Sequence, residues 1–369
     1  MKAWPIVGIA LMQALLLAAH WFLYQTWVAF WLPLSAAQDL ALRLILFLLA
    51  FTFVPAAFLG FYFASRLVTL LYWIAAVWLG FLNYFFLAAC LCRLSNLALV
   101  LLRLHTDRPM IAALFYGLAV AVSLFGLINA RSIRVRRISI RLAGLPASWR
   151  GRTGLLLSDL HLGIMNGPRF SRRIAALAAR LQPEIVFIAG DLFDGGKYSA
   201  RKLVEPLRTL DPPLGTYYST GNHDEFGDAA HYAESLSAIG IRVLSDEMLT
   251  LDGLQIIGVA YGGSGSPIRL RDTLQSLHLE RERASILLNH VPSRLPIVEQ
   301  AGISLQLSGH THGGQLFPYT WFTRRAFGNF TYGLQRFGGL QVYTSSGAGT
   351  WGPPMRVGTR SEVVLLTFE

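Results

Sequence analysis

The sequence predicts a membrane-embedded α-helical half followed by a water-soluble α/β half. Hydrophobic residues make up 53% of the 369 positions and charged residues only 14%, which is too apolar for an ordinary soluble protein. Only eight charged residues occur before residue 131, whereas the remainder has a normal globular mixture. From residue 153 onward, short apolar runs alternate with helical stretches, as in layered α/β domains. We therefore expect a transmembrane helical domain over 1–130, a basic connector with a first strand over 131–152, and a second domain over 153–369.

The first half contains four apolar stretches, each at or above the roughly 20 residues that an α-helix needs to cross a bilayer. The first stretch is too long for a signal-peptide core and lacks a small-residue cleavage site, so it is predicted to remain as a span. Cys90 and Cys92 are too close in sequence for an easy disulfide and are expected to be reduced thiols. The predicted spans are Trp4–Leu32, Leu40–Ala64, Leu67–Cys92 and Met110–Asn129.

The distribution of basic residues predicts the orientation of these spans. With four spans both termini lie on one side of the membrane, and the side with more lysine and arginine is normally cytoplasmic. That side holds Lys2, Arg66, Arg131, Arg134, Arg136, Arg137 and Arg141, against Arg43, Arg93, Arg103 and Arg108 on the other. We therefore expect an integral protein of a bacterial-type inner or plasma membrane, with its soluble half in the cytoplasm. The three arginines between the third and fourth spans argue in the opposite direction.

The connector has a charge pattern of its own. Residues 131–152 include seven arginines and no acidic residue, whereas basic and acidic residues balance at nineteen each over 153–369. Apolar residues alternate with arginines over 133–140, which predicts a strand with one face toward anionic lipid headgroups. Positive-inside orientation alone explains this charge equally well. Nucleic-acid binding is disfavoured because the charge is concentrated beside the predicted membrane.

The second half has the pattern of a layered domain. Predicted strands are Ile303–Leu307, Leu155–Leu157, Ile185–Ile188, Gly215–Tyr218, Leu254–Val259, Ile286–Leu288, Leu340–Tyr343 and Val363–Phe368. Helical spacing is found in Phe170–Leu181, Ala200–Leu210, Ala229–Ile239, Pro267–Leu277 and Ser293–Ala301.

Several predicted strands end in carboxylate, amide or imidazole side chains. Because loops beyond strand ends are where α/β domains build their sites, we expect these groups to converge. Oxygen and imidazole ligands without a thiolate suit manganese, iron or zinc. The side chains at these strand ends are Asp159, His161, Asp191, Asn222, His223, Asp224 and His290, which could converge with His310 and His312.

These motifs, in this order, resemble the calcineurin-like metallophosphoesterases. They are Asp159-x-His161, Gly190-Asp191, Gly221-Asn222-His223-Asp224, His290 and Gly309-His310-Thr311-His312. The chain most resembles a membrane-associated branch of that family, through Ser308–Gln315 and the glycines that precede Arg356 near the end of the sequence. The resemblance covers about residues 150 to 369 and implies a β-sandwich of two mixed sheets flanked by helices.

The resemblance also implies roles for individual residues. Asp159, His161, Asp191 and His312 would bind one divalent ion and Asp191, Asn222, His290 and His310 a second, with Asp191 bridging. His223 would contact phosphate and protonate the leaving oxygen, and Asp224 would orient it. Asp194 would support the ligands from outside. Asp194 and Asp224 could equally be solvated loop acids, and Arg356 is either a phosphate clamp or an ordinary surface or capping arginine.

The leading hypothesis is a membrane-anchored, two-metal phosphoesterase. It would hydrolyse a phosphodiester or pyrophosphate of a lipid-linked substrate by metal-activated hydroxide, with His223 as the general acid. One alternative is a nucleotide or nucleic-acid phosphodiesterase tethered to the membrane. Another is a non-catalytic metal-binding membrane scaffold. The sequence identifies no protein partner.

A stretch rich in aromatic residues follows the last histidines. Residues 316–337 contain eight aromatic side chains, three arginines and no acid. The rings either pack together as a small separate core or enter the lipid headgroup region, with Arg324 and Arg325 on lipid phosphates.

Overall fold

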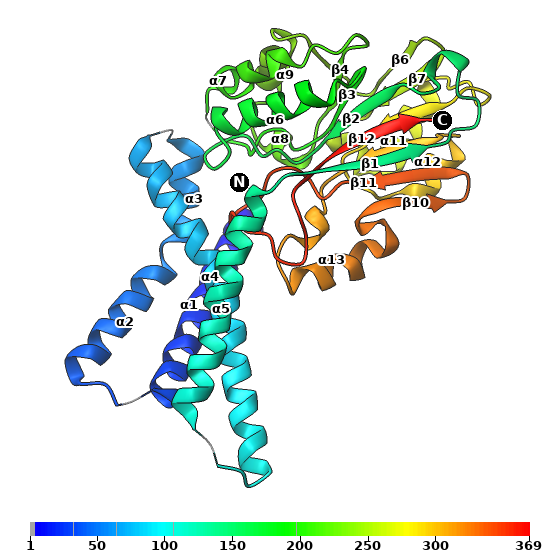
Figure 1. The fold of residues 1–369 in the computed structure, drawn as a ribbon. Helices are drawn as coiled ribbons and strands as arrows, with labels where there is room; N and C mark the ends of the chain where they lie inside the picture. Colours follow the sequence, from blue (N-terminus) through cyan, green and yellow to red (C-terminus); the bar gives the residue numbers. More distant parts are fainter. Residues whose placement is uncertain (1–3, 32, 64, 106, 197) are drawn as a thin grey trace. The chain divides into compact units, whose positions relative to one another are not determined.

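The computed structural model describes residues 4–31, 33–63, 65–105, 107–196 and 198–369, which form two compact units (Figure 1). One unit runs to Ile128 and includes Gly352–Met355, and the other comprises Asn129–Trp351 and Arg356–Glu369. Lys2, Leu32 and Ala64, which entered the predictions above, lie outside the described residues.

The first unit is helical, and its apolar helices confirm the four predicted stretches. Four stretches are long and apolar enough to cross a membrane: Val7–Phe30, Ala36–Tyr62, Arg66–Leu101 and Arg108–Arg131. The second stretch is broken at Phe51 and Thr52, just before Pro55, whose ring removes a backbone donor and crowds the preceding turn. The helices are α1 (Trp4–Phe30), α2 (Ala36–Ala50), α3 (Phe53–Tyr62), α4 (Arg66–Leu101) and α5 (Arg108–Arg131).

Helix α4 is longer than the sequence predicted. It continues nine residues past the expected end at Cys92, so Arg93 lies within a helix and not in a loop between spans. The Arg93 guanidinium donates to the carbonyl of Gln25 at 2.8 Å and to the hydroxyl of Thr26 at 3.2 Å, both on α1. These bonds explain how a charged side chain is accommodated inside an otherwise apolar helix.

The second unit contains two six-stranded mixed sheets, as the resemblance implied (Figure 1). The first sheet has the order β1 (Arg134–Ile140), β12 (Glu362–Phe368), β2 (Thr153–Leu157), β3 (Ile185–Ala189), β4 (Thr216–Ser219) and β5 (Ile241–Val243). The second has the order β10 (Gly333–Phe337), β11 (Leu340–Thr344), β9 (Leu305–Ser308), β8 (Ser285–Leu288), β7 (Leu254–Gly258) and β6 (Glu247–Leu251). Strands β2, β3 and β4 run parallel, as do β7, β8 and β9.

Because side chains point alternately to the two faces of each sheet, the apolar residues of this unit pack into three hydrophobic cores. Leu156 and Phe187 point to one face and pack with Ile286 of the other sheet, whereas Leu155 and Ile188 point to the opposite face. That opposite face is covered by α6 (Pro168–Leu181), α7 (Ala200–Val204) and α9 (Ala229–Ser237). The outer face of the second sheet is covered by α11 (Pro267–Ser276) and α12 (Leu295–Gln300). The sheets are therefore held rigidly from both sides, which fixes where their strand ends lie.

Several short elements were not predicted. Strands β5, β6 and β10 have three to five residues each, too few to establish an alternating pattern. The short helices are α8 (Asn222–Phe226), α10 (Tyr261–Ser264) and α13 (Tyr319–Phe327), with 3-10 turns η1 (Ala147–Trp149), η3 (His312–Gly314) and η4 (Gly328–Thr331). The predicted helix Ala200–Leu210 is present as α7 followed by the 3-10 turn η2 (Glu205–Thr209).

Candidate metal centre

Polar side chains from both sheets converge beyond the carboxyl ends of their strands. Asp159 follows β2, Asp191 follows β3, and Asn222 follows β4; His290 follows β8 and His310 follows β9. Ligand atoms lie within 4.8 Å of one another in three groups: Asp159–His161–His312, Asp191–His290–His310 and His161–Asp194–His223. The parallel registers of β2 to β4 and of β8 to β9 bring these loops to one edge of the sandwich.

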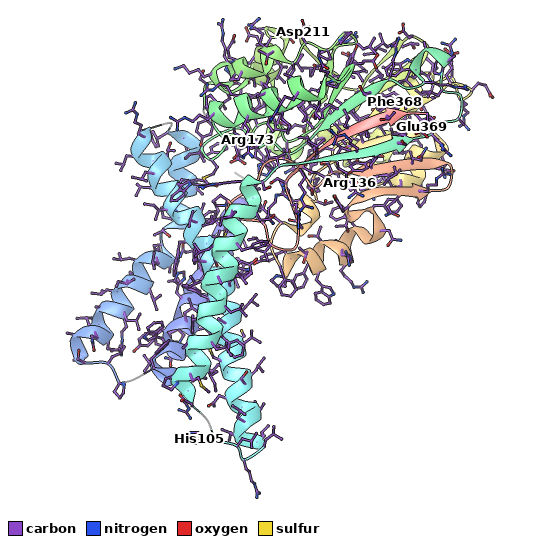
Figure 2. The ribbon with its side chains drawn as sticks, in the orientation of Figure 1. His105, Arg136, Arg173, Asp211, Phe368 and Glu369 are labelled. Carbon is purple, nitrogen blue, oxygen red and sulfur yellow. The ribbon has the colours of Figure 1, made fainter. Side chains whose placement is uncertain are left out.

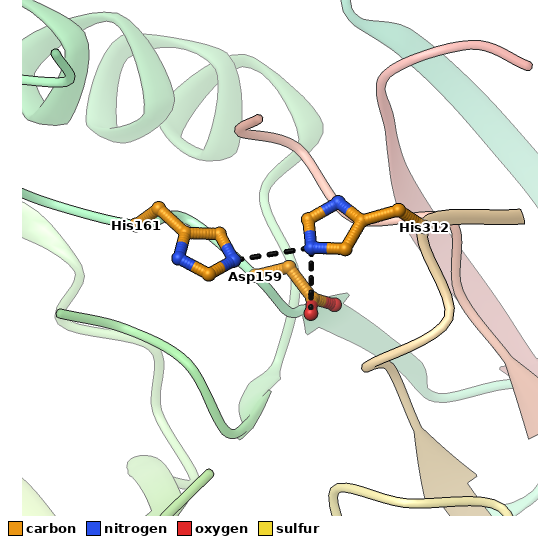
Figure 3. A group of neighbouring side chains, drawn as sticks. All are labelled: Asp159, His161 and His312. Atoms are coloured by element: carbon orange, nitrogen blue, oxygen red, sulfur yellow. Dashed lines mark hydrogen bonds and ion pairs between the residues drawn. The ribbon is translucent and has the colours of Figure 1, made fainter. Parts of the chain in front are cut away.

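The first group points three ligand atoms at one another (Figure 3). His161 Nε2 lies 3.1 Å from His312 Nε2, and His312 Nε2 lies 3.4 Å from Asp159 Oδ1. Two ring nitrogens that face each other beside a carboxylate offer lone pairs to a cation. The geometry of this group therefore fits a metal ion.

Asp191 lies between the first and second groups. Its Oδ2 atom is 3.1 Å from His290 Nε2 and 3.8 Å from His161 Nε2. Its other oxygen accepts a hydrogen bond from the backbone N–H of His223 at 2.8 Å. One carboxylate oxygen thus faces imidazoles of both groups. Next to them, Asn222 Oδ1 is 2.9 Å from His310 Nδ1.

His290 is held in the orientation that a metal ligand needs. Its Nδ1 atom lies 2.9 Å from the carbonyl oxygen of Ala189, which fixes the proton on Nδ1 and leaves Nε2 as the acceptor. Within the described part of the chain, the buried Nε2 faces Asp191 Oδ2 at 3.1 Å and no other polar group satisfies it. Buried polar atoms are normally satisfied. This atom and the surrounding oxygen and imidazole donors fit a divalent cation.

The backbone at the cluster adopts an uncommon conformation. Asp159, His161, Asp191, His310 and His312 all have positive φ, between 46° and 70°. Non-glycine residues held in sparsely populated regions cost on the order of 1–3 kcal/mol each, and such residues concentrate at functional sites. These five residues turn the chain sharply after each strand, so that the side chains face inward.

A glycine permits one close approach within the cluster. A Cβ atom on Gly309 would overlap the carboxylate of Asp159 and the hydroxyl of Ser158. The absence of a side chain lets the backbone N–H of His310 donate to Asp159 Oδ1 at 2.9 Å.

Burial and mutual charge perturb the titration of the cluster. Burial and the neighbouring Asp191 raise the pKa of Asp159, whereas His290 opposes this. Burial would also raise the pKa of Asp191, but the charges of His290 and His161 outweigh it and lower the value. Burial and His290 together lower the pKa of His310 to about 4. A neutral imidazole is the form that coordinates a metal.

The carboxylate beside His223 is Asp194 and not Asp224. Asp194 Oδ1 lies 3.6 Å from His223 Nδ1 and 3.1 Å from His161 Nδ1. Asp224 is fully buried, and its oxygens accept the backbone N–H groups of Phe193 and Gly221, each at 2.8 Å. Asp224 therefore caps α8 and does not face the His223 ring, whereas Asp194 lies beside it.

Arg356 has partners that the phosphate-clamp hypothesis did not anticipate. It is fully buried, and its Nη2 atom donates to the carbonyls of Ser346 at 2.6 Å and Gly349 at 2.7 Å. Nη1 donates to the carbonyl of His312 at 3.2 Å. Burial, His161 and the nearby guanidinium all lower the pKa of His312. Arg356 is thus a buried residue that connects the loops behind His312, and not a surface arginine.

The aromatic stretch is partly packed against the core and partly exposed. Phe330 and Phe337 pack against the core of the second sheet, whereas Trp321 and Phe322 on α13 are 63% and 55% exposed. Arg324 and Arg325, offered as candidate phosphate ligands, lie on the same helix and are exposed. Neither belongs to the metal-binding groups found among the described residues.

Two exposed rings beside His223 were missed by the sequence reasoning. The ring centroids of Phe226 and Trp351 lie 5.6 Å and 5.8 Å from that of His223. Trp351 is tied to Gln315 by hydrogen bonds in both directions, at 2.9 Å and 3.0 Å. Phe226 stands three residues after His223 on α8, a spacing that could have indicated the contact, whereas Trp351 comes from a segment more than a hundred residues further along the chain.

Comparison with known proteins identifies the family. A family model described as calcineurin-like phosphoesterase matches residues 155–314. A transmembrane protein with metallophosphoesterase domain from Danio rerio is 32% identical over 320 residues, covering 79% of this chain and 71% of that protein. An uncharacterized metallophosphoesterase of Campylobacter jejuni is 31% identical over 219 residues, covering 58% of each chain.

A solved structure is also similar. A dimetal phosphatase from Danio rerio covers 60% of this chain and 100% of its own, with 12% identity and a TM-score of 0.37, a similarity too distant to indicate function. The family model and the transmembrane relative, together with the converging ligands, show that this chain belongs to the calcineurin-like phosphoesterase family and is a metal-dependent phosphoester hydrolase.

Proposed function

We propose that this chain is a two-metal phosphoesterase that hydrolyses a phosphodiester or pyrophosphate of a lipid-linked substrate at the membrane surface. The observation that carries the two-metal proposal is the position of Asp191, whose Oδ2 faces His290 at 3.1 Å and His161 at 3.8 Å. One ion would be held by Asp159, His161, Asp191 and His312, and the other by Asp191, Asn222, His290 and His310. The oxygen and imidazole donors suit manganese, iron or zinc.

The chemistry follows from the groups around this site. Two bound divalent cations would supply Lewis acidity at the phosphoryl group and a nucleophile at neutral pH. His223 would donate a proton to the ester oxygen as its bond to phosphorus breaks. Asp194, 3.6 Å from His223 Nδ1, would hold that ring in position. Exposed Phe226 and Trp351 would line the space through which the leaving group departs.

The lipid-linked substrate rests on the organisation of the chain. We propose boundaries of 1–130 for the membrane domain, 131–152 for the connector and 153–369 for the hydrolase, with the hydrolase on the cytoplasmic side. Helix α5 ends at Arg131 and β1 begins at Arg134, so the hydrolase domain is tethered to its membrane helix by two residues. Such a tether suits a substrate that is itself held in the bilayer.

The metal roles are tested by substitution at two residues of the cluster. Asp191→Asn should abolish turnover and strip metal, because its carboxylate faces both groups of ligands. His223→Asn should lose about 10²–10⁴-fold in rate while retaining metal, since a general acid contributes this much. Turnover would be measured with Mn²⁺ on bis-p-nitrophenyl phosphate and on a phospholipid panel, together with metal content by elemental analysis.

A surface carboxylate provides the matched control. Asp211, labelled in Figure 2, is exposed on the hydrolase domain, and Asp211→Asn should leave both rate and metal content unchanged. Normal activity in Asp191→Asn, or loss of metal in His223→Asn, would contradict the assignment. Turnover of soluble nucleotides but of no lipid in the panel would favour a tethered nucleotide phosphodiesterase.

A further inference from the structure

A second polar pocket lies apart from the metal centre. It has a volume of about 790 Å³ and lies within the second unit, between β1, α13 and the segment that leads into β12. None of the seven candidate metal ligands lines it. Its charged lining consists of Arg134, Arg136, Arg324 and Arg360 with one acid, Glu362.

The single acid in this pocket is already satisfied. Glu362 is 3% exposed, and its carboxylate accepts hydrogen bonds from the hydroxyls of Tyr332 at 2.7 Å and Tyr343 at 3.2 Å. The backbone N–H of Ser346 donates a third bond at 3.2 Å. Arg136, labelled in Figure 2, donates to the Tyr332 hydroxyl at 3.0 Å and lies over its ring.

The other three arginines of the pocket are not neutralised by the acidic side chains that the structure describes. Within the ranges that the structure describes, Arg134, Arg324 and Arg360 form no ion pair with an acidic side chain. All three are exposed, and they come from β1, α13 and the segment before β12, so the fold brings them together from distant parts of the chain. Converging guanidinium groups without acid partners are suited to phosphate.

The apolar surroundings indicate the source of that phosphate. Trp321 lines the pocket and is 63% exposed, and Phe322 and Tyr319 on the same helix are 55% and 53% exposed. Aromatic rings beside arginines are typical of surfaces that enter the headgroup region. A site for a free phosphate ion does not require exposed aromatic rings. Arg134 also begins the strand that follows the membrane helix α5 after two residues.

We propose that this pocket binds the phosphate of an anionic phospholipid headgroup, at a site separate from the metal centre. Arg134, Arg324 and Arg360 contact the phosphate oxygens, and Trp321 lies against the glycerol and upper acyl region. The site holds a lipid without cleaving it, so its occupation does not depend on the hydrolytic function proposed above.

The test is lipid binding by the full-length protein in a neutral detergent. Short-chain phosphatidylglycerol is titrated into wild type, Arg324→Gln and Arg360→Gln, and dissociation constants are measured by calorimetry. Each variant should weaken binding by about tenfold or more, because it loses a charge-assisted hydrogen bond to the phosphate. The matched control is Arg325→Gln, the neighbouring exposed arginine of α13, which does not line the pocket and should change binding by less than about twofold.

Two further ligands distinguish a lipid headgroup from other molecules that carry phosphate. Inorganic phosphate and a single-stranded oligonucleotide should both bind far more weakly than the lipid. Equal losses in Arg325→Gln would mean that α13 attracts lipid by diffuse charge, which overturns the pocket. Unchanged binding in both pocket variants, or inorganic phosphate binding as tightly as the lipid, would also overturn it. Thermal melting identifies any misfolded variant, in which case Arg134→Gln on β1 replaces it.

Discussion

Replacing Arg356 distinguishes a structural arginine from a phosphate clamp. Arg356→Met keeps an unbranched side chain of comparable length but removes all guanidinium donors. The two shortest of these bonds run to the carbonyls of Ser346 at 2.6 Å and Gly349 at 2.7 Å. At about 1.5–3 kcal/mol for each bond that involves a charged group, losing these two alone destabilises the domain by roughly 3–6 kcal/mol.

This loss should be visible as a change in melting temperature. For a domain of this size, about 1 kcal/mol corresponds to roughly 2–4 °C, so Arg356→Met should lower the Tm of the hydrolase domain by about 6 °C or more. Metal affinity should fall with it, because the same guanidinium holds the carbonyl of His312. Arg356→Lys should recover little, since an ammonium cannot replace the planar fork.

The assay is thermal unfolding of the full-length protein, monitored by near-ultraviolet circular dichroism. Metal affinity is measured separately by titration. Arg325→Met, on exposed α13, is the control and should melt as wild type. A normal Tm and normal metal content in Arg356→Met, with KM alone increased, would refute this reasoning and restore the phosphate-clamp hypothesis.

Two further predictions concern the His223 surroundings and the orientation of the chain. Asp194→Asn should weaken metal binding by about 10–100-fold, because a carboxylate behind a ligating histidine contributes this much, and should reduce kcat through the displaced His223 ring. Retention of full metal affinity by this variant would mean that the 3.1 Å contact to His161 is incidental. A reporter fused after Glu369 should behave as cytoplasmic, and protease added outside intact spheroplasts should leave residues 150–369 uncut. External cleavage in that range would reverse the orientation.

The candidate ligands could be selected from sequence because their chemistry is local. Each lies within five residues of the end of a predicted strand, and the residue types within Asp159-x-His161 or Gly309-His310-Thr311-His312 already indicate cation binding. The membrane helices were equally accessible, since roughly 20 consecutive apolar residues suffice to predict a span. Even there, the break before Pro55 follows from the proline ring, whereas the continuation of α4 past Arg93 is accompanied by contacts of Arg93 with α1.

The contacts that these residues make could not be predicted from the sequence in the same way. Asp194 and Asp224 are both acids near strand ends, and only the folded chain shows that Asp224 bonds the backbone of α8 while Asp194 faces His161 and His223. Arg356 is similarly buried among carbonyls of its own segment and of His312, a set of partners that the sequence does not indicate.

Composition and motif spacing by themselves determined the membrane half, the hydrolase half and the set of side chains able to bind metal. Tertiary structure decided the order of strands in the two sheets, the positive φ angles that turn five of those side chains inward, and the arginine pocket that joins β1 to α13. The physical reason is that residue chemistry and hydrophobic period are local properties. Burial, orientation and the pairing of charges depend on contacts between segments that can lie more than two hundred residues apart, such as β1 and β12.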